Sequence, residues 1–301
     1  MSAPRVAIVL LALPTQVERT QRCLDSLAEL DARPAHSILL WIQGAQDPAP
    51  IADGIRARHP TVRVVHHGHN LGVAGGRNAA AHRILNDAQE PPSHLFFLDN
   101  DMTVEPDLLG RLLEVVDEPS IGLATGKILS LDDPDRLYGA GGCRIRFWRG
   151  DTGHVGRGEL DRGQYDRRSD ILPSGGCFLV RTDVFEALGG FDEVFSPYGP
   201  EDLDFGLRAR ADGWQARYAP RAIAYHPTEP GRSFGDGREG STYVANRVRQ
   251  WLRFLRRHGS PLDQLGFTLV GGPWIAARML IRALFHGRLT ATLRGLLRSV
   301  G

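Results

Sequence analysis

Short strand-like runs and longer helix-like runs alternate regularly from Val6 to Val116, and this rhythm constrains the fold more than any other feature of the sequence. The strand-like runs are continuously apolar, whereas the helix-like runs repeat their apolar residues at helical spacing. Such alternation predicts an α/β fold with a mostly parallel central sheet flanked by helices, and ligands bound beyond the carboxyl ends of the strands. The pairs are Val6–Leu11 with Val17–Leu30, Ser37–Ile42 with a stretch toward Arg58, Val62–His66 with Gly75–Ala88, and Leu95–Leu98 with Glu105–Val116.

Two carboxylates follow the fourth strand-like run. Asp99 and Asp101 are two residues apart, so an extended backbone would send both side chains to one face and Asn100 to the other. Both acids would then face one ligand, as in a site for a divalent metal and a diphosphate. An acidic turn that only closes the strand is the competing interpretation, because Asp and Asn are common turn residues. The triplet alone does not choose between the two.

A second acidic cluster and an isolated histidine favour the metal interpretation. Pro200, Glu201 and Asp202 are typical of the first turn of a helix, which we expect to continue through Arg210. His226 ends a β-rich segment and precedes a proline, which stops the strand and leaves the imidazole available as a ligand. Taken alone, a histidine at a strand end is more often an ordinary surface residue. Together with the Asp triplet, these residues are the parts that a metal-assisted group transfer needs.

A glycine-rich segment, Asn70-Leu71-Gly72-Val73-Ala74-Gly75-Gly76-Arg77-Asn78, joins the third strand-like run to its helix. Its glycines would let the backbone approach a phosphate or ribose, and the start of the helix would offer free N–H groups to an anion. The spacing matches neither a dinucleotide-binding fingerprint nor a P-loop. A purely structural turn is an equal alternative.

Composition excludes only extreme classes of protein. The chain of 301 residues, 42% hydrophobic and 24% charged, is ordinary for a globular protein with a substantial core. Cys23, Cys143 and Cys177 are too few and too widely spaced for a disulfide framework or a zinc site, which favours a reducing compartment. The amino terminus leads directly into a strand-like run and lacks the features of a signal peptide. We therefore expect a cytoplasmic protein.

Charge is distributed unevenly along the chain. The formal net charge is +1, but the residues from Asn246 onward carry ten arginines against one acid, Asp263, and the preceding residues carry 26 basic against 34 acidic side chains. Arginines and apolar residues interleave at helical spacing in this basic region, which predicts amphipathic helices. Such helices can lie on an anionic membrane or simply carry a solvated charged face. The apolar run from Leu265 to Ala277 is too short to cross a bilayer, which needs about 20 residues.

Several motifs occur in a fixed order over residues 5 to 257. The glycine-rich segment is followed by Phe97–Asp101 and then by a long block from Pro173 to His226. In this combination the chain resembles the family 2 glycosyltransferases of the GT-A fold, within the rhamnosyltransferase-like group. The block contains Ser174-Gly175-Gly176-Cys177-Phe178-Leu179-Val180-Arg181, Gly189-Gly190-Phe191-Asp192, Glu201-Asp202-Leu203-Asp204-Phe205 and Tyr218-Ala219-Pro220.

The resemblance implies a fold and a division of the chain. The catalytic domain would be a GT-A domain with a Rossmann-like, mostly parallel sheet over residues 1–230. Residues 231–301 would form a flexible loop and a basic, amphipathic helical extension, and the tail after Gly259 is not diagnostic of the family.

The resemblance also implies roles for single residues. Asp101 and His226 would bind a divalent cation, Mn²⁺ or Mg²⁺, that bridges the donor diphosphate, and Asp202 would be the general base that deprotonates the acceptor. The reaction implied is an inverting transfer from a UDP- or dTDP-sugar to an acceptor hydroxyl by direct displacement. The substrate-binding residues would be Leu11, Gln43, Asn70, Gly75, Arg77, Asp99, Asn100, Gly175, Gly176 and Glu201, with Asp99 near the ribose and Glu201 near the acceptor.

Two stretches depart from the family pattern. Members often have a Thr-Tyr-Asn-Arg-like stretch after the first strand, where this chain has Ala12-Leu13-Pro14-Thr15. They also often have an Asp-Asn pair that contacts the base after the second strand, where this chain has Ile42-Gln43-Gly44-Ala45. Gln43 could still pair with a uracil or thymine edge, because its amide both donates and accepts. The identity of the base is therefore open.

Two other functions are alternatives. A sugar-phosphate nucleotidyltransferase also uses metal-binding acids, but it needs a glycine-rich basic loop after the first strand, where this chain has Leu11–Gln16. A non-enzymatic module that binds phosphate or nucleic acid through the basic tail is the other. We expect no nucleic-acid partner, because no such motif is present and the acidic part would be repelled. We expect a nucleotide-sugar donor and a carbohydrate, lipid-linked or small-molecule acceptor, with peripheral contact to the inner face of the membrane as a further hypothesis.

Overall fold

The computed structural model describes residues 3–169, 171–173, 176–197, 199–228 and 241–277. The chain divides into two compact units. The first comprises Met1–Cys143, His154–Glu193 and Glu201–Thr228, and the second comprises Arg144–Gly153, Val194–Pro200 and Glu229–Gly301. We predicted an extension over 231–301; the second unit also includes two short stretches from earlier in the chain. The loop predicted at the start of that extension, residues 231–240, lies outside the described residues.

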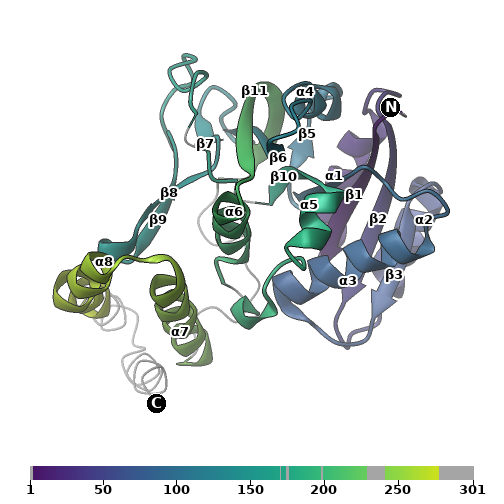
Figure 1. Cartoon of the computed structure of the whole chain (residues 1–301). Helices are drawn as coiled ribbons and strands as arrows, with labels where there is room; N and C mark the ends of the chain where they lie inside the picture. The colour runs from purple at the N-terminus through teal and green to yellow at the C-terminus, as the bar shows by residue number, and fades with distance from the viewer. Residues whose placement is uncertain (1–2, 170, 174–175, 198, 229–240, 278–301) are drawn as a thin grey trace. The chain divides into compact units, whose positions relative to one another are not determined.

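The first unit is built on one nine-stranded sheet (Figure 1). Its strands are β1 (Arg5–Ala12), β2 (Ala35–Gln43), β3 (Arg63–His67), β4 (His94–Asp99), β5 (Thr103–Val104), β6 (Ile121–Ser130), β7 (Leu137–Ala140), β10 (Cys177–Arg181) and β11 (Gln215–His226). The order is β3-β2-β1-β4-β10-β6-β11-β5, with β7 paired to β6. Strands β3, β2, β1 and β4 are parallel neighbours, β11 is parallel to β6, and β10 runs antiparallel between β4 and β6. The mostly parallel sheet predicted from the sequence is therefore confirmed.

Helices cover both faces of this sheet. They are α1 (Val17–Ala28), α2 (Ala49–Arg58), α3 (Gly72–Asp87), α4 (Leu108–Glu114), α5 (Thr182–Ala187) and α6 (Glu201–Ala211). Alternate residues of β1 point to opposite faces, so Ile8 packs in one buried cluster with α1, α2 and α4, and Val9 packs in another with α3, α5 and α6. Burial on both faces explains why β1 is a continuous apolar run in the sequence.

Helix α3 begins earlier than predicted, at Gly72 rather than Gly75. Gly72 has a φ of 75°, a conformation that glycine adopts without strain. Gly76 lies within the first turns and faces the sheet, where a Cβ would lie 2.7 Å from both Gln43 Oε1 and Leu11 Cδ1. Gly76 therefore lets α3 pack closely on β1 and β2, and Gly75 and Gly76 lie within the helix rather than in a turn before it.

The strand ends bring the candidate site residues together. Strand β4 ends at Asp99, and helix α6 begins at Glu201 as the sequence predicted. Strand β11 ends at His226 and is longer than expected from the sequence. Because Tyr225 pairs with Thr103 of β5, the chain just after the Asp triplet lies beside the end of β11. This pairing places His226 next to the acids, although more than a hundred residues separate them in sequence.

The second unit contains η1 (Phe147–Arg149), α7 (Ser241–His258), α8 (Pro261–Gly266) and η3 (Phe267–Gly271). It also contains η2 (Glu193–Phe195) apart from its first residue. A separate two-stranded sheet is formed by β8 (Cys143–Arg146) and β9 (Asp151–His154), which belong to the second unit apart from Cys143 and His154. Phe254 of α7 is fully buried against Phe147 and Phe195. A capping box between Ser260 and Asp263 starts α8. None of the helices in the described part of the chain is long and apolar enough to cross a membrane.

Candidate functional site

Asp99, Asp101 and His226 come together where β4 and β11 end. One possible ligand atom from each residue lies within 4.8 Å of the others. Asp101 Oδ1 faces His226 Nε2 at 3.9 Å, and both side chains are buried, whereas the Asp99 side chain is 41% exposed. The structure thus joins two acids and a histidine that the sequence singled out separately. We refer to them as the Asp99–Asp101–His226 cluster.

The donor set of this cluster fits a divalent cation. His226 Nδ1 lies 2.7 Å from the carbonyl oxygen of Pro227, which can only accept, so Nδ1–H donates there, and Nε2, which faces Asp101, is the ring nitrogen that could bind a metal ion. Two carboxylates and an imidazole suit Mn²⁺ or Mg²⁺. Burial and the neighbouring Asp99 raise the pKa of Asp101, although His226 and Arg19 oppose the shift. A bound cation would relieve this repulsion between the two carboxylates.

An aromatic ring holds the plane of the His226 imidazole. Tyr138 of β7 stacks on it with the ring centroids 4.1 Å apart and the planes at 19°. The guanidinium of Arg157 lies over the Tyr138 ring at 4.4 Å, and His154 lies beside it at 4.9 Å. Burial lowers the pKa of His154 to about 4, with help from Arg157 and His226, so His154 adds no charge to this stack at neutral pH. Tyr138 was not identified from the sequence, because no local pattern marks a ring that stacks on a distant histidine.

Replacing Tyr138 with alanine should weaken Mn²⁺ binding by about 10-fold, because partners that orient a metal-ligating histidine commonly contribute 10–100-fold to affinity. Tyr138→Phe keeps the stacked ring and should bind Mn²⁺ like the wild type. Electron paramagnetic resonance titration of free Mn²⁺ measures both affinities without any transfer reaction. Equal losses in the two variants would assign the effect to the hydroxyl group and contradict a stacking role.

Arg77 connects the cluster to helix α6. Its Nη2 donates to Asp99 Oδ1 at 2.8 Å and its Nη1 donates to Glu201 Oε1 at 3.2 Å. Burial by itself lowers the pKa of Arg77, but Asp99 and Glu201 more than reverse this effect, and the net shift is upward. The guanidinium therefore stays charged and also contacts the ring of Phe191 at 5.6 Å. One buried guanidinium thus links Asp99 at the end of β4 to Glu201 at the start of α6.

Glu201 and Asp202 form the first turn of α6. Burial raises the pKa of Glu201 to about 8, and the charge of Asp202 contributes, which together outweigh the lowering by Arg77. A proton on Glu201 removes the repulsion between two adjacent carboxylates. Asp202 is less buried than Glu201, and its Oδ1 accepts a hydrogen bond from the Leu203 N–H at 2.8 Å. The two carboxyl groups therefore differ in burial and hydrogen bonding, although they are neighbours with the same chemistry.

The amide of Gln43 is hydrogen-bonded within the protein. Its Nε2 donates to Asn70 Oδ1 and to the carbonyl of Gly72, both at 3.0 Å, and its Oε1 accepts from the Leu71 N–H at 3.3 Å. The side chain is only 3% exposed. We expected the amide to be available for a uracil or thymine edge, but in the structure it ties the end of β2 to the segment before α3. Asn70 takes part in the same network, since its Oδ1 also accepts from the Gly72 N–H.

Asn100 turns away from the two acids of the triplet, as the strand geometry predicted. Its Nδ2 donates to Thr20 Oγ1 at 2.7 Å and to Gln16 Oε1 at 3.0 Å, so the buried amide ties the triplet to helix α1. Both of these contacts are within the protein, and the contact of Asn100 with substrate stays a prediction.

Gly176 touches the acid at the end of β4. Its carbonyl accepts from the Asp99 N–H at 2.7 Å, its φ is 64°, and a Cβ there would overlap the Asp99 carboxyl group. Only glycine fits this position. Gly175, which we predicted to act with it, lies outside the described residues.

The remaining predicted residues lie on the elements next to the cluster. Leu11 pairs with Asp99 across β1 and β4. Gly75 is buried in the first turn of α3, where a Cβ would lie 3.4 Å from Glu193 Oε2. A residue that the sequence did not single out, Arg19 of α1, donates from Nη1 to Asp101 Oδ2 at 3.3 Å.

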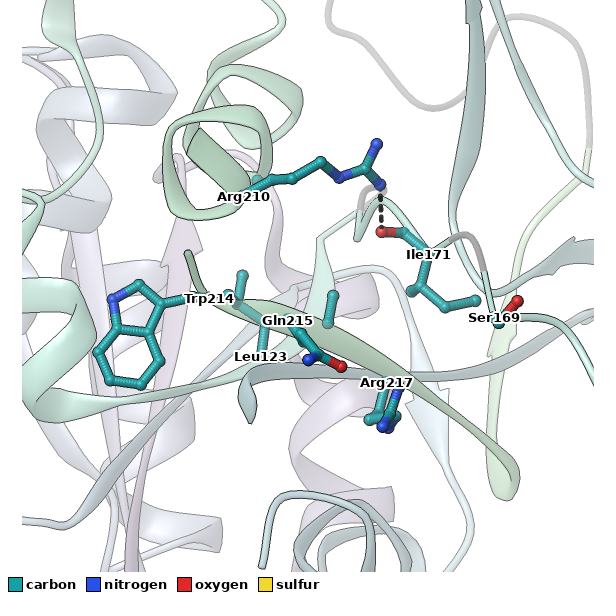
Figure 2. A pocket seen from close by; sticks show the side chains of 9 residues that line it. Leu123, Ser169, Ile171, Arg210, Trp214, Gln215 and Arg217 are labelled. Atoms are coloured by element: carbon teal, nitrogen blue, oxygen red, sulfur yellow. Dashed lines mark hydrogen bonds between the residues drawn. The ribbon is translucent and has the colours of Figure 1, made fainter. Parts of the chain in front are cut away.

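A separate cavity of about 300 Å³ lies over β11 and α6 (Figure 2). Arg210 crosses it and donates to the Ile171 carbonyl at 3.0 Å, and Trp214 lies at its side. No acid of the predicted site lines it, so this cavity is distinct from the candidate active site. Its lining residues are Leu123, Ser169, Ile171, Gly206, Arg210, Trp214, Gln215, Ala216 and Arg217.

Comparison with known proteins agrees with this architecture. The N-acetylglucosaminyl-diphospho-decaprenol L-rhamnosyltransferase of Mycobacterium tuberculosis is 28% identical over 282 residues, which cover 87% of this chain and 89% of that protein. The crystal structure of GalNAc-T7 with UDP, GalNAc and Mn²⁺ has a TM-score of 0.65 at 14% identity and covers 85% of this chain and 48% of that one. The mannosyltransferase PcManGT from Pyrobaculum calidifontis, in complex with GDP-Man and Mn²⁺, has a TM-score of 0.58 at 13% identity and covers 100% of this chain and 88% of that one.

The structural likenesses show that the chain has the GT-A fold. The profile of the family described as Glycosyltransferase like family 2 matches residues 4–252, which is most of the chain and includes every residue of the candidate site. This match selects the glycosyltransferase interpretation over the nucleotidyltransferase and the non-enzymatic module. The chain therefore belongs to glycosyltransferase-like family 2, and the protein is a glycosyltransferase.

Proposed function

We propose that the protein is a metal-dependent, inverting enzyme that moves a sugar from a UDP- or dTDP-sugar to an acceptor hydroxyl. The observation that carries this proposal is the Asp99–Asp101–His226 cluster, whose ligand atoms lie within 4.8 Å of one another. Arg77 joins Asp99 of this cluster to Glu201, the residue before the proposed base Asp202. A cation site and a carboxylate base on one rim are what displacement of a diphosphate by a hydroxyl requires.

On the donor side, Asp101 and His226 would hold the divalent cation. When bound, that cation neutralises negative charge on the departing diphosphate. Asp99 is held by Arg77 and keeps 41% of its side chain exposed, which suits a contact with the donor ribose. Gly176 leaves room for the Asp99 carboxyl group, which a Cβ at this position would overlap. These residues would orient the donor so that its anomeric carbon faces α6.

On the acceptor side, Asp202 would take the proton of the acceptor hydroxyl. As the bond from that oxygen to the anomeric carbon forms, the bond from the anomeric carbon to the diphosphate breaks, and the electron pair leaves with the diphosphate. Asp202 lies in the first turn of α6, a rigid element, and Glu201 beside it would position the acceptor. One base and direct displacement invert the configuration at the anomeric carbon.

A lipid-linked sugar diphosphate is the acceptor class that we propose. The Mycobacterium tuberculosis relative is named for a decaprenol-linked acceptor and for transfer of L-rhamnose, and it is similar over 87% of this chain. A 6-deoxyhexose donor and a polyprenyl-linked acceptor are accordingly the first substrates to test.

Calorimetric titration of UDP, dTDP and GDP into the purified protein, each with and without Mn²⁺, tests the donor side of the proposal. We expect one nucleoside diphosphate to bind, and to bind only with the metal, because without a cation between them the diphosphate would lie directly beside the carboxylates of Asp99 and Asp101. Failure of all three nucleotides to bind in the presence of Mn²⁺ would contradict the proposed function.

An apolar surface on the second unit supports contact with the membrane in which such an acceptor is found. Five of the eight exposed large apolar side chains in the described part of the chain lie between residues 262 and 274. Asp263 is the one charged residue in that stretch, and arginine-rich sequence flanks it on both sides. Apolar residues bordered by arginines suit an anionic lipid surface. The five are Leu262, Leu265, Leu269, Val270 and Trp274, with exposed fractions of 53–79%.

The double substitution Leu265→Glu and Leu269→Glu should reduce binding to vesicles that contain phosphatidylglycerol by about 10-fold or more, because two apolar anchors are lost and two anionic charges are added. Flotation on a sucrose gradient measures the bound fraction. Leu160→Glu is the matched control, since Leu160 is 41% exposed on the first unit. Equal flotation of the wild type, the double variant and the control would count against this surface, and a shift to dimers in light scattering would assign it to self-association.

A further inference from the structure

Arg19 contacts the proposed metal site from a helix that the sequence motifs do not involve. It is the third residue of α1, and its Nη1 donates to Asp101 Oδ2 at 3.3 Å. The other oxygen of Asp101 faces His226. The Asp101 carboxylate therefore lies between a proposed metal ligand on one side and a guanidinium on the other.

A neighbouring hydrogen bond fixes this arrangement. Thr20, the next residue of α1, accepts from Asn100 Nδ2 at 2.7 Å, and Asn100 directly precedes Asp101. The Thr20 hydroxyl in turn donates to the Gln16 carbonyl at 2.6 Å within the same helix turn. The buried Asn100 amide thus sets the register of α1 against the triplet, and this register brings Arg19 to Asp101.

The two arginines of the site differ in how they are held. Arg77 is 5% exposed, and its guanidinium pairs with both Asp99 and Glu201 within the protein. The Arg19 side chain is 22% exposed, and its carboxylate partner is Asp101, the residue that we assign to the metal. A divalent cation coordinated by the Asp101 carboxylate would leave the Arg19 guanidinium beside the site without its counter-ion. The nearest new anion would be the diphosphate that the same metal binds.

We propose that Arg19 is a diphosphate-binding residue of the donor site. Before the donor binds, Arg19 is the counter-ion of Asp101, and afterwards it contacts the diphosphate. This inference rests on the proposed function. A guanidinium offers several N–H donors in a planar fork that matches phosphate oxygens. Placed there before the reaction, it would also stabilise the negative charge that develops on the leaving diphosphate. Arg19 would then share with the metal the work of neutralising that group.

The Arg19→Gln variant should change metal and nucleotide binding in opposite directions. Mn²⁺ alone should bind a few-fold more tightly, because the competing positive charge next to Asp101 is gone. The nucleoside diphosphate that the wild type binds should bind about 10- to 100-fold more weakly at saturating Mn²⁺, because a charge-assisted hydrogen bond is lost. The nucleotide affinity of Arg19→Lys should lie between those of the wild type and Arg19→Gln, since lysine keeps the positive charge and loses the planar set of N–H donors.

Both affinities are measured by calorimetry on the full chain, with melting temperature as the control for folding. Arg22→Gln is the matched control, because Arg22 is an exposed arginine on the same helix. Unchanged nucleotide affinity in Arg19→Gln would overturn the inference. A parallel loss of Mn²⁺ and nucleotide affinity would also overturn it, since Arg19 would then only hold Asp101 in place. Failure of the wild type to bind any of UDP, dTDP and GDP with Mn²⁺ would instead contradict the proposed function.

Discussion

Asp202→Asn should lower the rate of sugar transfer by roughly 10²–10⁴-fold, the contribution of a positioned general base, while the affinities for donor and Mn²⁺ stay near those of the wild type. An asparagine has the same shape as an aspartate, and its Oδ1 can still accept the Leu203 N–H that Asp202 accepts at 2.8 Å. The amide cannot take up a proton from the acceptor hydroxyl. The substitution therefore removes the ability of residue 202 to accept a proton and leaves the shape and the hydrogen bond of its side chain in place.

Single-turnover transfer, measured alongside calorimetric donor binding, separates the two effects. Asp212→Asn serves as the matched control, because Asp212 is an exposed aspartate just after α6. Retention of normal transfer in Asp202→Asn would exclude it as the base. Loss of donor binding together with transfer would assign Asp202 to the donor site instead.

The local pattern of the sequence was sufficient to predict most of the central sheet. Strand β1 could be predicted because it is buried on both faces, which forces a continuous apolar run such as Val6–Leu11. Helix α6 could be predicted because Pro200, Glu201 and Asp202 are typical of a helix start, and the helix begins at Glu201 in the structure. For both β1 and α6, the residues of the element and those next to it in sequence were sufficient for the prediction.

Contacts between elements set the features that the sequence did not predict. Gln43 has the chemistry to pair with a base, and only the positions of Asn70 and Gly72 in space show that its amide is occupied. The start of α3 was misplaced because the same glycines suit an open turn or a helix packed closely on a sheet. The stacking of Tyr138 on His226 likewise depends on the pairing of β7 and β11 with β6.

The residues of the metal cluster were an intermediate case. Two aspartates at one strand end have a fixed spacing that local geometry predicts, and the structure places both in one group with His226. His226 carried no local signal of its own, and its position beside Asp101 depends on the pairing of Tyr225 with Thr103. The ordered motifs connected the two, because they add information about the whole chain that no single segment holds.

Asp101→Asn should weaken Mn²⁺ binding by well over 100-fold, and His226→Ala by about 10- to 100-fold, with transfer at limiting Mn²⁺ falling in the same order. Mn²⁺ and Mg²⁺ are hard cations that prefer an anionic oxygen to a neutral imidazole nitrogen. Loss of Asp101 also leaves Arg19 without its carboxylate, which adds unbalanced positive charge near the ion. Loss of His226 leaves both carboxylates of the cluster in place.

The two variants should therefore respond differently to added metal. Millimolar Mn²⁺ should restore much of the transfer activity of His226→Ala, because the remaining acids still form a weaker site, whereas Asp101→Asn should recover little. Mn²⁺ titration by electron paramagnetic resonance, with Asp212→Asn as the control, gives the affinities independently of catalysis. An unchanged titration in His226→Ala would remove this residue from the coordination shell and leave Asp99 and Asp101 as the metal ligands. We expect the charge of Asp101 to dominate metal binding, because its carboxylate contacts Arg19 on one side and approaches His226 on the other. Equal rescue of both variants by Mn²⁺ would contradict this expectation.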